Sequence, residues 1–181
     1  MKRKPLILKL TAYILLAALL VFGFEIFYPR TYSVPEAVVR AGTQYWNLPN
    51  GDKIGYAFIA AKGLKKTYPV IYLHGGPGGH ITDHDIRIFS SFADSGYEVY
   101  LYDQAGSGQS ARLADIEQYT VHRHIEDLDA IIQKIGAQKI ILIGQSWGAI
   151  LATLFATAHA DKIDKLILTS PGPVYPVHPE L

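Results

Sequence analysis

The stretch Ile140-Ile141-Leu142-Ile143-Gly144-Gln145-Ser146-Trp147-Gly148 decides the fold of this chain. Its four apolar residues predict a buried strand, and the residues after it are prone to form a helix. A serine on a sharp turn between a strand and a helix exposes its hydroxyl above the sheet, and the flanking Gly144 and Gly148 let neighbouring segments approach. The helix N-terminus and the Trp147 N–H favour the negative charge that develops on an attacked carbonyl oxygen. The pattern predicts a nucleophile elbow with Ser146 as the nucleophile; the alternative is an ordinary Ser-Gly turn, because a bare G-x-S-x-G also arises by chance.

Apolar strands and helical segments alternate along the rest of the chain. The pair Asn50-Gly51 predicts a type I′ hairpin turn. Thr120 is expected to cap a helix that Gly136 ends. Strands are expected at 43–48, 54–60, 70–74, 98–103, 140–143 and 165–170, with a further helix at 86–93. Strands joined by helical crossovers require an α/β fold, a mostly parallel sheet with helices on both faces, here preceded by a hairpin.

Composition limits the function classes. The 181 residues are 49% hydrophobic and 18% charged, which is typical of a globular protein. The net charge is +1, and the excess of basic over acidic residues lies in residues 1–30. The rest of the chain has no Lys/Arg stripe that would favour nucleic-acid binding. There is no cysteine, which excludes disulfides and thiolate chemistry. The sequence contains no cluster of metal ligands and no dinucleotide fingerprint, so neither a metal nor a cofactor is expected.

The N-terminal segment predicts a membrane helix. As a helix, residues 6–28 would span about 34 Å, enough for a hydrocarbon core of about 30 Å. Lys9 and Glu25 lie near its ends, and Lys2-Arg3-Lys4 is expected to stay in the cytoplasm, which places the following domain on the extracytoplasmic side. The alternative is a signal peptide that is cleaved to release a secreted protein. The expected organisation is an anchor or signal segment at 1–30, a linker at 31–42 and a folded domain from 43 to 181.

Two glycine-rich loops follow predicted strands, at the edge where open α/β sheets bind ligands. In the first, His74-Gly75-Gly76-Pro77-Gly78-Gly79, the Gly76 N–H is expected to be a second oxyanion donor opposite that of Trp147. Gly75 and Pro77 shape this loop, and His74 is interpreted as a hydrogen-bonding residue that stabilises it rather than as a general base. A phosphate-cradling loop is the alternative, but no Gly-Lys-Ser/Thr follows. In the second loop, Asp103 is interpreted as a structural acceptor of backbone N–H groups rather than as a catalytic acid.

These three segments together carry a family resemblance. The order His-Gly-Gly-Pro-Gly, then Asp-Gln-x-Gly-x-Gly-x-Ser, then Gly-x-Ser-Trp-Gly resembles the α/β-hydrolase superfamily, and within it the prolyl iminopeptidase branch, over residues 43–172. The resemblance implies a serine hydrolase that removes an N-terminal residue, commonly proline, from short peptides through an acyl-serine intermediate. It also implies that Ser146 is the nucleophile and that Gly76 and Trp147 are the oxyanion donors. Ala105 departs from the family, which usually has arginine there, and this favours a more general esterase or amidase.

The triad Asp and His of this family follow the serine along the chain. After the elbow, the acidic and histidine residues are Asp161, Asp164, Glu180, His159 and His178. None matches the family position, because Asp161 and Asp164 fall in the connection before the last strand and His159 at the far end of the elbow helix. The chain is therefore expected to be the N-terminal part of a hydrolase, without the C-terminal strands and cap. The alternatives are a non-catalytic membrane-anchored binding module, a degraded fragment or, less compatible with a serine at the elbow, an epoxide or haloalkane hydrolase.

Overall fold

The computed structural model describes residues 4–31 and 38–172. The chain divides into two compact units, residues 1–36 and 37–181, which are described separately. Several positions considered above lie outside the described residues: Lys2, Arg3, His178, Glu180 and, within the expected linker, residues 32–37.

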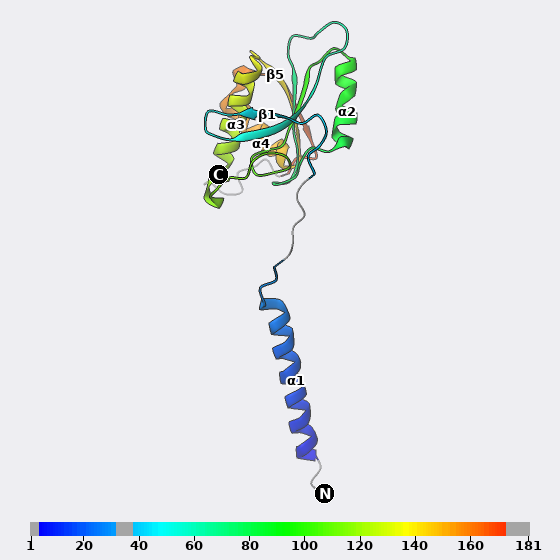
Figure 1. Ribbon diagram of the computed structural model, residues 1–181, viewed down its shortest axis with the longest axis vertical. Helices are drawn as coiled ribbons and strands as arrows, with labels where there is room; N and C mark the ends of the chain where they lie inside the picture. The colour runs from blue at the N-terminus through cyan, green and yellow to red at the C-terminus, as the bar shows by residue number, and fades with distance from the viewer. Residues whose placement is uncertain (1–3, 32–37, 173–181) are drawn as a thin grey trace. The chain divides into compact units, whose positions relative to one another are not determined.

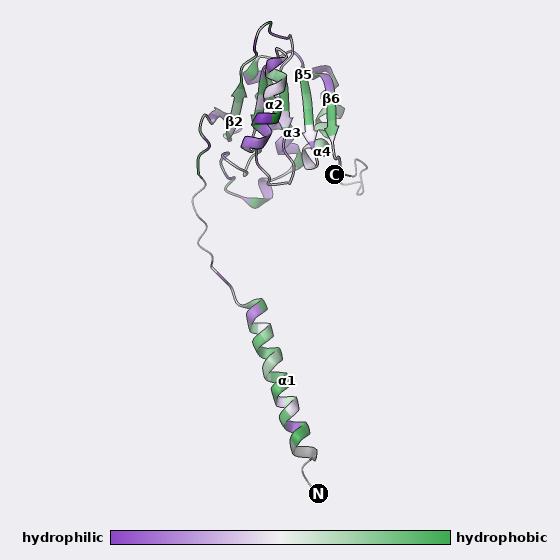
Figure 2. Ribbon diagram, turned by 90° about the vertical axis from the view of Figure 1, so that its right-hand side faces the viewer, coloured by the Kyte–Doolittle hydropathy of each residue, from purple (hydrophilic) through white to green (hydrophobic). Residues whose placement is uncertain are grey.

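The first unit contains the helix α1 (Lys4–Phe27), which agrees with the predicted apolar helix (Figure 1). Its segment Ile7–Phe27 has a mean hydropathy of 2.3, and none of it is buried. Hydrophobic residues dominate the face of the helix that Figure 2 shows, and large exposed apolar side chains occur along it from Ile7 to Phe27. A helix of this length and composition suits either a membrane anchor or a signal sequence, because it is long and apolar enough to cross the hydrocarbon core of a bilayer.

The second unit is built on a six-stranded sheet with the order β1-β2-β4-β3-β5-β6. Strands β3, β4, β5 and β6 run parallel, whereas β1 pairs antiparallel with β2, and β2 pairs antiparallel with β4. The strands are β1 (Gln44–Asn47), β2 (Lys53–Ile59), β3 (Val70–Leu73), β4 (Val99–Tyr102), β5 (Ile140–Gln145) and β6 (Ile163–Thr169). The expected mostly parallel sheet with an N-terminal hairpin is confirmed.

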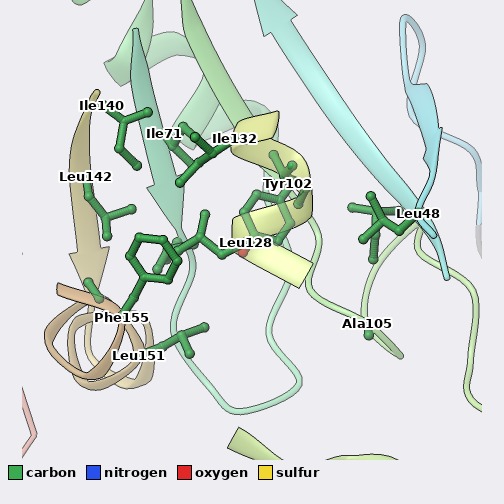
Figure 3. Packing of buried hydrophobic residues seen from close by; sticks show 14 residues of the cluster. Leu48, Ile71, Tyr102, Ala105, Leu128, Ile132, Ile140, Leu142, Leu151 and Phe155 are labelled. Carbon is green, nitrogen blue, oxygen red and sulfur yellow. The ribbon is translucent and has the colours of Figure 1, made fainter. Parts of the chain in front are cut away.

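Helices cover both faces of the sheet, and each face has its own core. Successive strand residues point to opposite faces, so Ile71 and Leu73 of β3 pack with α3 (Val121–Ile135) and α4 (Trp147–Ala158). Figure 3 shows Phe155 and Leu128 of these helices around the same strands. Val70 and Tyr72 instead join the cluster that contains Phe89 of α2 (Asp83–Asp94), on the other face. Strand β5, which leads into the elbow, alternates in the same way: Ile140 and Leu142 join the first cluster and Ile141 and Ile143 the second, so it is buried on both faces.

Local signals account for the helix ends. The Thr120 hydroxyl accepts the Arg123 N–H at 3.1 Å, and Gly136 closes α3 in the left-handed conformation, as predicted. Helix α2 begins three residues before the predicted start. There, Thr82 and Asp85 form a capping box in which each side chain accepts the other residue's backbone N–H.

The turn between β1 and β2 differs from the type I′ prediction. The Gly51 N–H donates to Leu48 O at 3.0 Å, and Gly51 has φ 91°, whereas Asn50 is not among the residues with positive φ. A type I′ turn requires positive φ at both central residues. Pro49 takes the first central position instead, where its ring fixes a negative φ. The result is a three-residue loop that ends in a left-handed glycine.

Strand β6 lies at one edge of the described sheet and starts earlier than predicted. Asp164, expected in the preceding connection, is its second residue, because Ile163 already pairs with Ile140. Leu166 and Ile167 of this strand are 37% and 39% exposed, unlike the apolar residues of β3 and β5.

Candidate active site

Ser146 occupies a sharp turn between β5 and α4. Its backbone angles are φ 51° and ψ −115°, a combination that a non-glycine residue rarely adopts and that costs about 1–3 kcal/mol. The Ser146 N–H donates to Thr169 O at 3.0 Å, and the Tyr72 hydroxyl donates to Gln145 Oε1 at 2.6 Å. Contacts to β6 and β3 therefore hold the strained turn from both sides.

The glycines around Ser146 are required by close backbone contacts. A methyl group on Gly148 would lie 2.2 Å from Leu73 O, and one on Gly144 would lie 2.3 Å from Gly148 O. On the facing loop, a methyl on Gly75 would come within 3.2 Å of Ser146 Cβ. The loop after β3 therefore lies directly against the serine, as the elbow geometry demands.

The Ser146 hydroxyl and two backbone N–H groups at this turn and the facing loop have no hydrogen-bond partner among the described residues. Ser146 is exposed, and within residues 4–31 and 38–172 its hydroxyl makes no hydrogen bond. In the same part of the chain, the backbone N–H groups of Gly76 and Trp147 also have no acceptor. An unpaired N–H beside a nucleophile can bind an oxyanion.

Gln104, which the sequence did not single out, joins three loops. Its backbone N–H donates to His74 Nε2 at 3.0 Å, and its side-chain amide donates to His74 O at 2.9 Å. Its amide oxygen accepts the Trp147 indole N–H at 3.0 Å. The residue is 3% exposed, so these bonds are shielded from water. Its place in the Asp-Gln-x-Gly segment was the only sequence signal for this role.

His74 is a neutral, buried histidine. Because Nε2 accepts the Gln104 N–H, the proton is on Nδ1, which donates to Gly75 O at 2.8 Å. Burial lowers the pKa of His74, which keeps the ring uncharged near neutral pH. Both ring nitrogens are thus engaged in holding the loop that faces Ser146.

Asp103 is fully buried and bonded on both carboxylate oxygens. Oδ1 accepts the Ile81 N–H at 2.7 Å and Oδ2 the Gln109 N–H at 2.8 Å, while Arg40 Nη2 lies 3.6 Å from Oδ2. These partners belong to three separate segments, which the carboxylate ties together.

The described histidines and acids do not form a base next to Ser146. His159 stacks on Phe155 with ring centroids 4.7 Å apart, and His122 pairs with Glu126 at 3.2 Å. His124 makes an edge contact with the Trp147 ring, with centroids 6.4 Å apart. Within the described ranges, no imidazole forms a hydrogen bond with the serine hydroxyl.

A comparison with protein families identifies the fold. The family model described as "alpha/beta hydrolase fold" matches residues 68–180, which contain both glycine-rich loops and the elbow. The chain belongs to the α/β-hydrolase family. Its sheet order and its serine on a strand–turn–helix elbow agree with that assignment.

Curated relatives of this α/β-hydrolase are proline iminopeptidases. The chain is 34% identical over 122 residues to the enzyme of Saccharolobus solfataricus, covering 66% of this chain and 38% of the relative. It is 33% identical over 130 residues to that of Clostridioides difficile, covering 65% and 44%, respectively. The match to the Arabidopsis thaliana enzyme is 33% over 101 residues, 56% of this chain and 26% of the relative. The chain thus spans less than half the length of these relatives.

Solved structures show the same fold. A probable hydrolytic enzyme from Pseudomonas aeruginosa superposes with a TM-score of 0.64 at 24% identity, covering 78% of this α/β-hydrolase and 43% of the other chain. An epoxide hydrolase from Vigna radiata also gives 0.64 at 24% identity, covering 77% and 42%, respectively. At this identity the likeness concerns the fold alone.

Proposed function

We propose that this chain carries the nucleophile and oxyanion groups of a serine hydrolase of the prolyl iminopeptidase type. The observation that carries the proposal is Ser146, which is exposed and held at φ 51° on the elbow, with a hydroxyl that makes no hydrogen bond within the described residues. In the proposed reaction the Ser146 Oγ attacks a peptide, amide or ester carbonyl. The Gly76 and Trp147 N–H groups bind the resulting oxyanion, and an acyl-serine forms as the leaving group departs.

Labelling with an alkyl fluorophosphonate tests this proposal on the full 181-residue chain. Ser146 is the sole serine of the tryptic peptide 140–162, so an adduct on this peptide is readily identified by mass spectrometry. We expect the adduct in the wild type and its loss in Ser146→Ala. Labelling is expected to be slow, because a serine without a base remains protonated near neutral pH.

Ser170→Ala is the matched control, because Ser170 is also exposed and has positive φ but lies outside the elbow. This variant should label like the wild type. Absence of any adduct on 140–162, or equal labelling of Ser146→Ala on that peptide, would contradict the proposal. The remaining interpretation would then be a non-catalytic binding module, which the lack of an imidazole partner for Ser146 among the described residues favours.

The relatives support a peptidase, whereas Ala105 supports a broader substrate range. The proline iminopeptidases that resemble this chain motivate prolyl substrates for the whole protein. In the epoxide hydrolase chemistry of the other neighbours a carboxylate would stand at the elbow, where this chain has Ser146. Comparison of prolyl, other aminoacyl and simple ester substrates, with hydrolysis rates as the readout, separates the peptidase from the esterase.

Helix α1 supports a membrane-anchored enzyme with its hydrolase unit on the extracytoplasmic side. The length and hydropathy of Ile7–Phe27 are sufficient to cross a bilayer, and three basic residues precede this segment. Secretion after signal cleavage is the alternative. The intact mass of the protein from the membrane fraction distinguishes them, since an anchored protein retains residues 1–30.

A further inference from the structure

A hollow of about 360 Å³ lies beside the elbow, and neither oxyanion binding nor the nucleophile accounts for it. Three segments distant in sequence form its walls: the loop after β3, the loop after β4 and the start of α3. Trp147, the residue after the candidate nucleophile, completes it. The lining side chains that matter here are Pro77, Ala105, Tyr119, Val121, His124 and Trp147.

Three of these side chains are aromatic rings, and most polar groups in the walls already have partners. The Trp147 indole N–H and the Gln104 amide bond to each other, and Gln104 also bonds to His74. The Tyr119 hydroxyl accepts the Leu113 N–H at 2.8 Å. The hollow is therefore lined by ring faces and edges, with few free polar atoms. Such walls favour the binding of a ligand that carries an aromatic ring, because tilted and edge-to-face ring pairs attract.

His124 is the exception among the polar groups of the lining. It is 8% exposed, yet its ring nitrogens form no hydrogen bond with any residue in the described part of the chain. Burial lowers the pKa of His124, so the ring is neutral and offers one donor and one acceptor. The ring nitrogens are not among the fully buried atoms without a partner, so they are open to a ligand in the hollow, and a ligand atom that bonds to one of them adds a hydrogen bond on binding.

We propose that this hollow binds an aromatic ring bearing one hydrogen-bonding atom, with the His124 imidazole as its polar partner. The position of Trp147 next to Ser146 makes the hollow a subsite for an aromatic group of the substrate. That assignment to the substrate rests on the proposed hydrolase function, whereas binding of the ring itself does not require Ser146 to react.

Titration with p-cresol and toluene tests the proposal, since the two molecules share the ring and methyl group and differ only in the hydroxyl. The full chain, labelled with ¹⁵N-histidine and held in detergent micelles, reports through its imidazole signals. We expect p-cresol to shift the His124 signals and to bind roughly three- to tenfold more weakly to His124→Leu, as loss of one hydrogen bond predicts. Toluene should not discriminate between the two proteins.

Matched variants make the result specific. His122→Leu changes an exposed histidine of the same helix and should leave p-cresol affinity unchanged. Val121→Trp fills the hollow and should abolish the shifts, which keeps the test decisive even where His124→Leu does not fold. All variants are compared in the same micelles, so partition of the phenol into detergent affects each of them equally.

Equal p-cresol affinity of the wild type and His124→Leu, absence of saturable binding, or shifts that persist in Val121→Trp would each overturn the proposal. Ser146→Ala separates this inference from the proposed function, because it should retain p-cresol binding while losing the fluorophosphonate adduct. Binding of p-cresol without any fluorophosphonate adduct would support the aromatic subsite and contradict the proposed hydrolase function. An adduct on Ser146 without p-cresol binding would support the proposed hydrolase function and contradict the aromatic subsite.

Discussion

At the scale of single residues, the candidate site depends on buried polar groups that satisfy one another. Gln104 bonds to the carbonyl of His74 and to the indole of Trp147, and thereby fixes the two loops that flank Ser146. The elbow serine itself is strained and exposed, so its position is set by these neighbours and not by bonds of its own hydroxyl.

Replacement of Gln104 by leucine should destabilise the protein because it leaves the buried His74 carbonyl and the half-buried Trp147 indole N–H without partners. Each orphaned group costs about 1–3 kcal/mol, so we expect the free energy of unfolding to fall by about 2–4 kcal/mol in urea denaturation. Gln133→Leu, at an exposed helix position, should change it by less than about 0.5 kcal/mol. Equal effects of the two substitutions would show that the Gln104 bonds contribute no net stability.

At the scale of elements, the elbow requires α4 to pass very close to β3. The contact between Gly148 and the Leu73 carbonyl leaves no space for a side chain, and both partners are backbone. Strand β5 is buried on both faces and bonded to strands on both sides, so it cannot shift to make room.

Gly148→Ala should therefore separate α4 from β3. We expect a loss of at least about 2 kcal/mol in the free energy of unfolding and a sharp drop in Ser146 labelling, because overpacking forces backbone movement. Gly63→Ala is the control: its added methyl meets open space, and only the left-handed backbone at φ 73° opposes it, at a cost of about 1 kcal/mol. A Gly148→Ala protein with wild-type stability and labelling would refute the close-packed elbow.

At the scale of the whole molecule, a buried carboxylate makes stability depend on pH. Asp127 of α3 is 1% exposed; Oδ1 accepts the Asn50 amide at 2.6 Å, and Oδ2 has no partner within the described residues. Burial raises the pKa of Asp127 to about 7, and the nearby Asp52 charge acts in the same direction. Arg123 bonds to Asp52, which leaves Asp127 without a cation of its own.

The direction in which stability changes with pH follows from the protons that the folded and unfolded states bind. The folded state holds the Asp127 proton more tightly than the unfolded state, so this contribution to stability is complete below pH 3.8 and is lost as the pH rises through about 7. His74 and His124 act oppositely, because their lowered pKa values make stability fall as the pH drops below 6.5. The contributions of these three residues to the pH dependence of stability partly cancel in the wild type, so a variant is needed to separate them.

The stability advantage of Asp127→Asn over the wild type should grow with pH, by roughly 1–3 kcal/mol between pH 5 and pH 8, measured by urea denaturation at both pH values. The amide keeps the bond to Asn50 and removes the charge. Asp94→Asn, at an exposed position, should leave the difference between the two pH values unchanged. A stabilisation that does not grow with pH would contradict a raised Asp127 pKa.

Much of the fold was predictable because its signals are local. A branched apolar run, a Gly-x-Ser-x-Gly turn and a helix-prone stretch are consecutive in the chain, so neighbouring residues alone specify the strand, the elbow and α4. Thr120 and Gly136 likewise mark the ends of α3 from within a few residues. The type I′ prediction was wrong for an equally local reason, since Pro49 restricts the turn that Asn50-Gly51 would otherwise form.

The sequence by itself determined the alternating strands and helices, the apolar N-terminal helix and the position of Ser146, because each follows from periodicity or turn chemistry between near neighbours. Only the tertiary structure decided that Gln104 joins His74 to Trp147, that Asp127 is buried without a cation and that His124 faces a hollow beside the elbow. These features arise where segments 30 or more residues apart meet, as for Gln104 and His74. Burial and hydrogen-bond partners depend on those meetings, which periodicity along the chain does not encode.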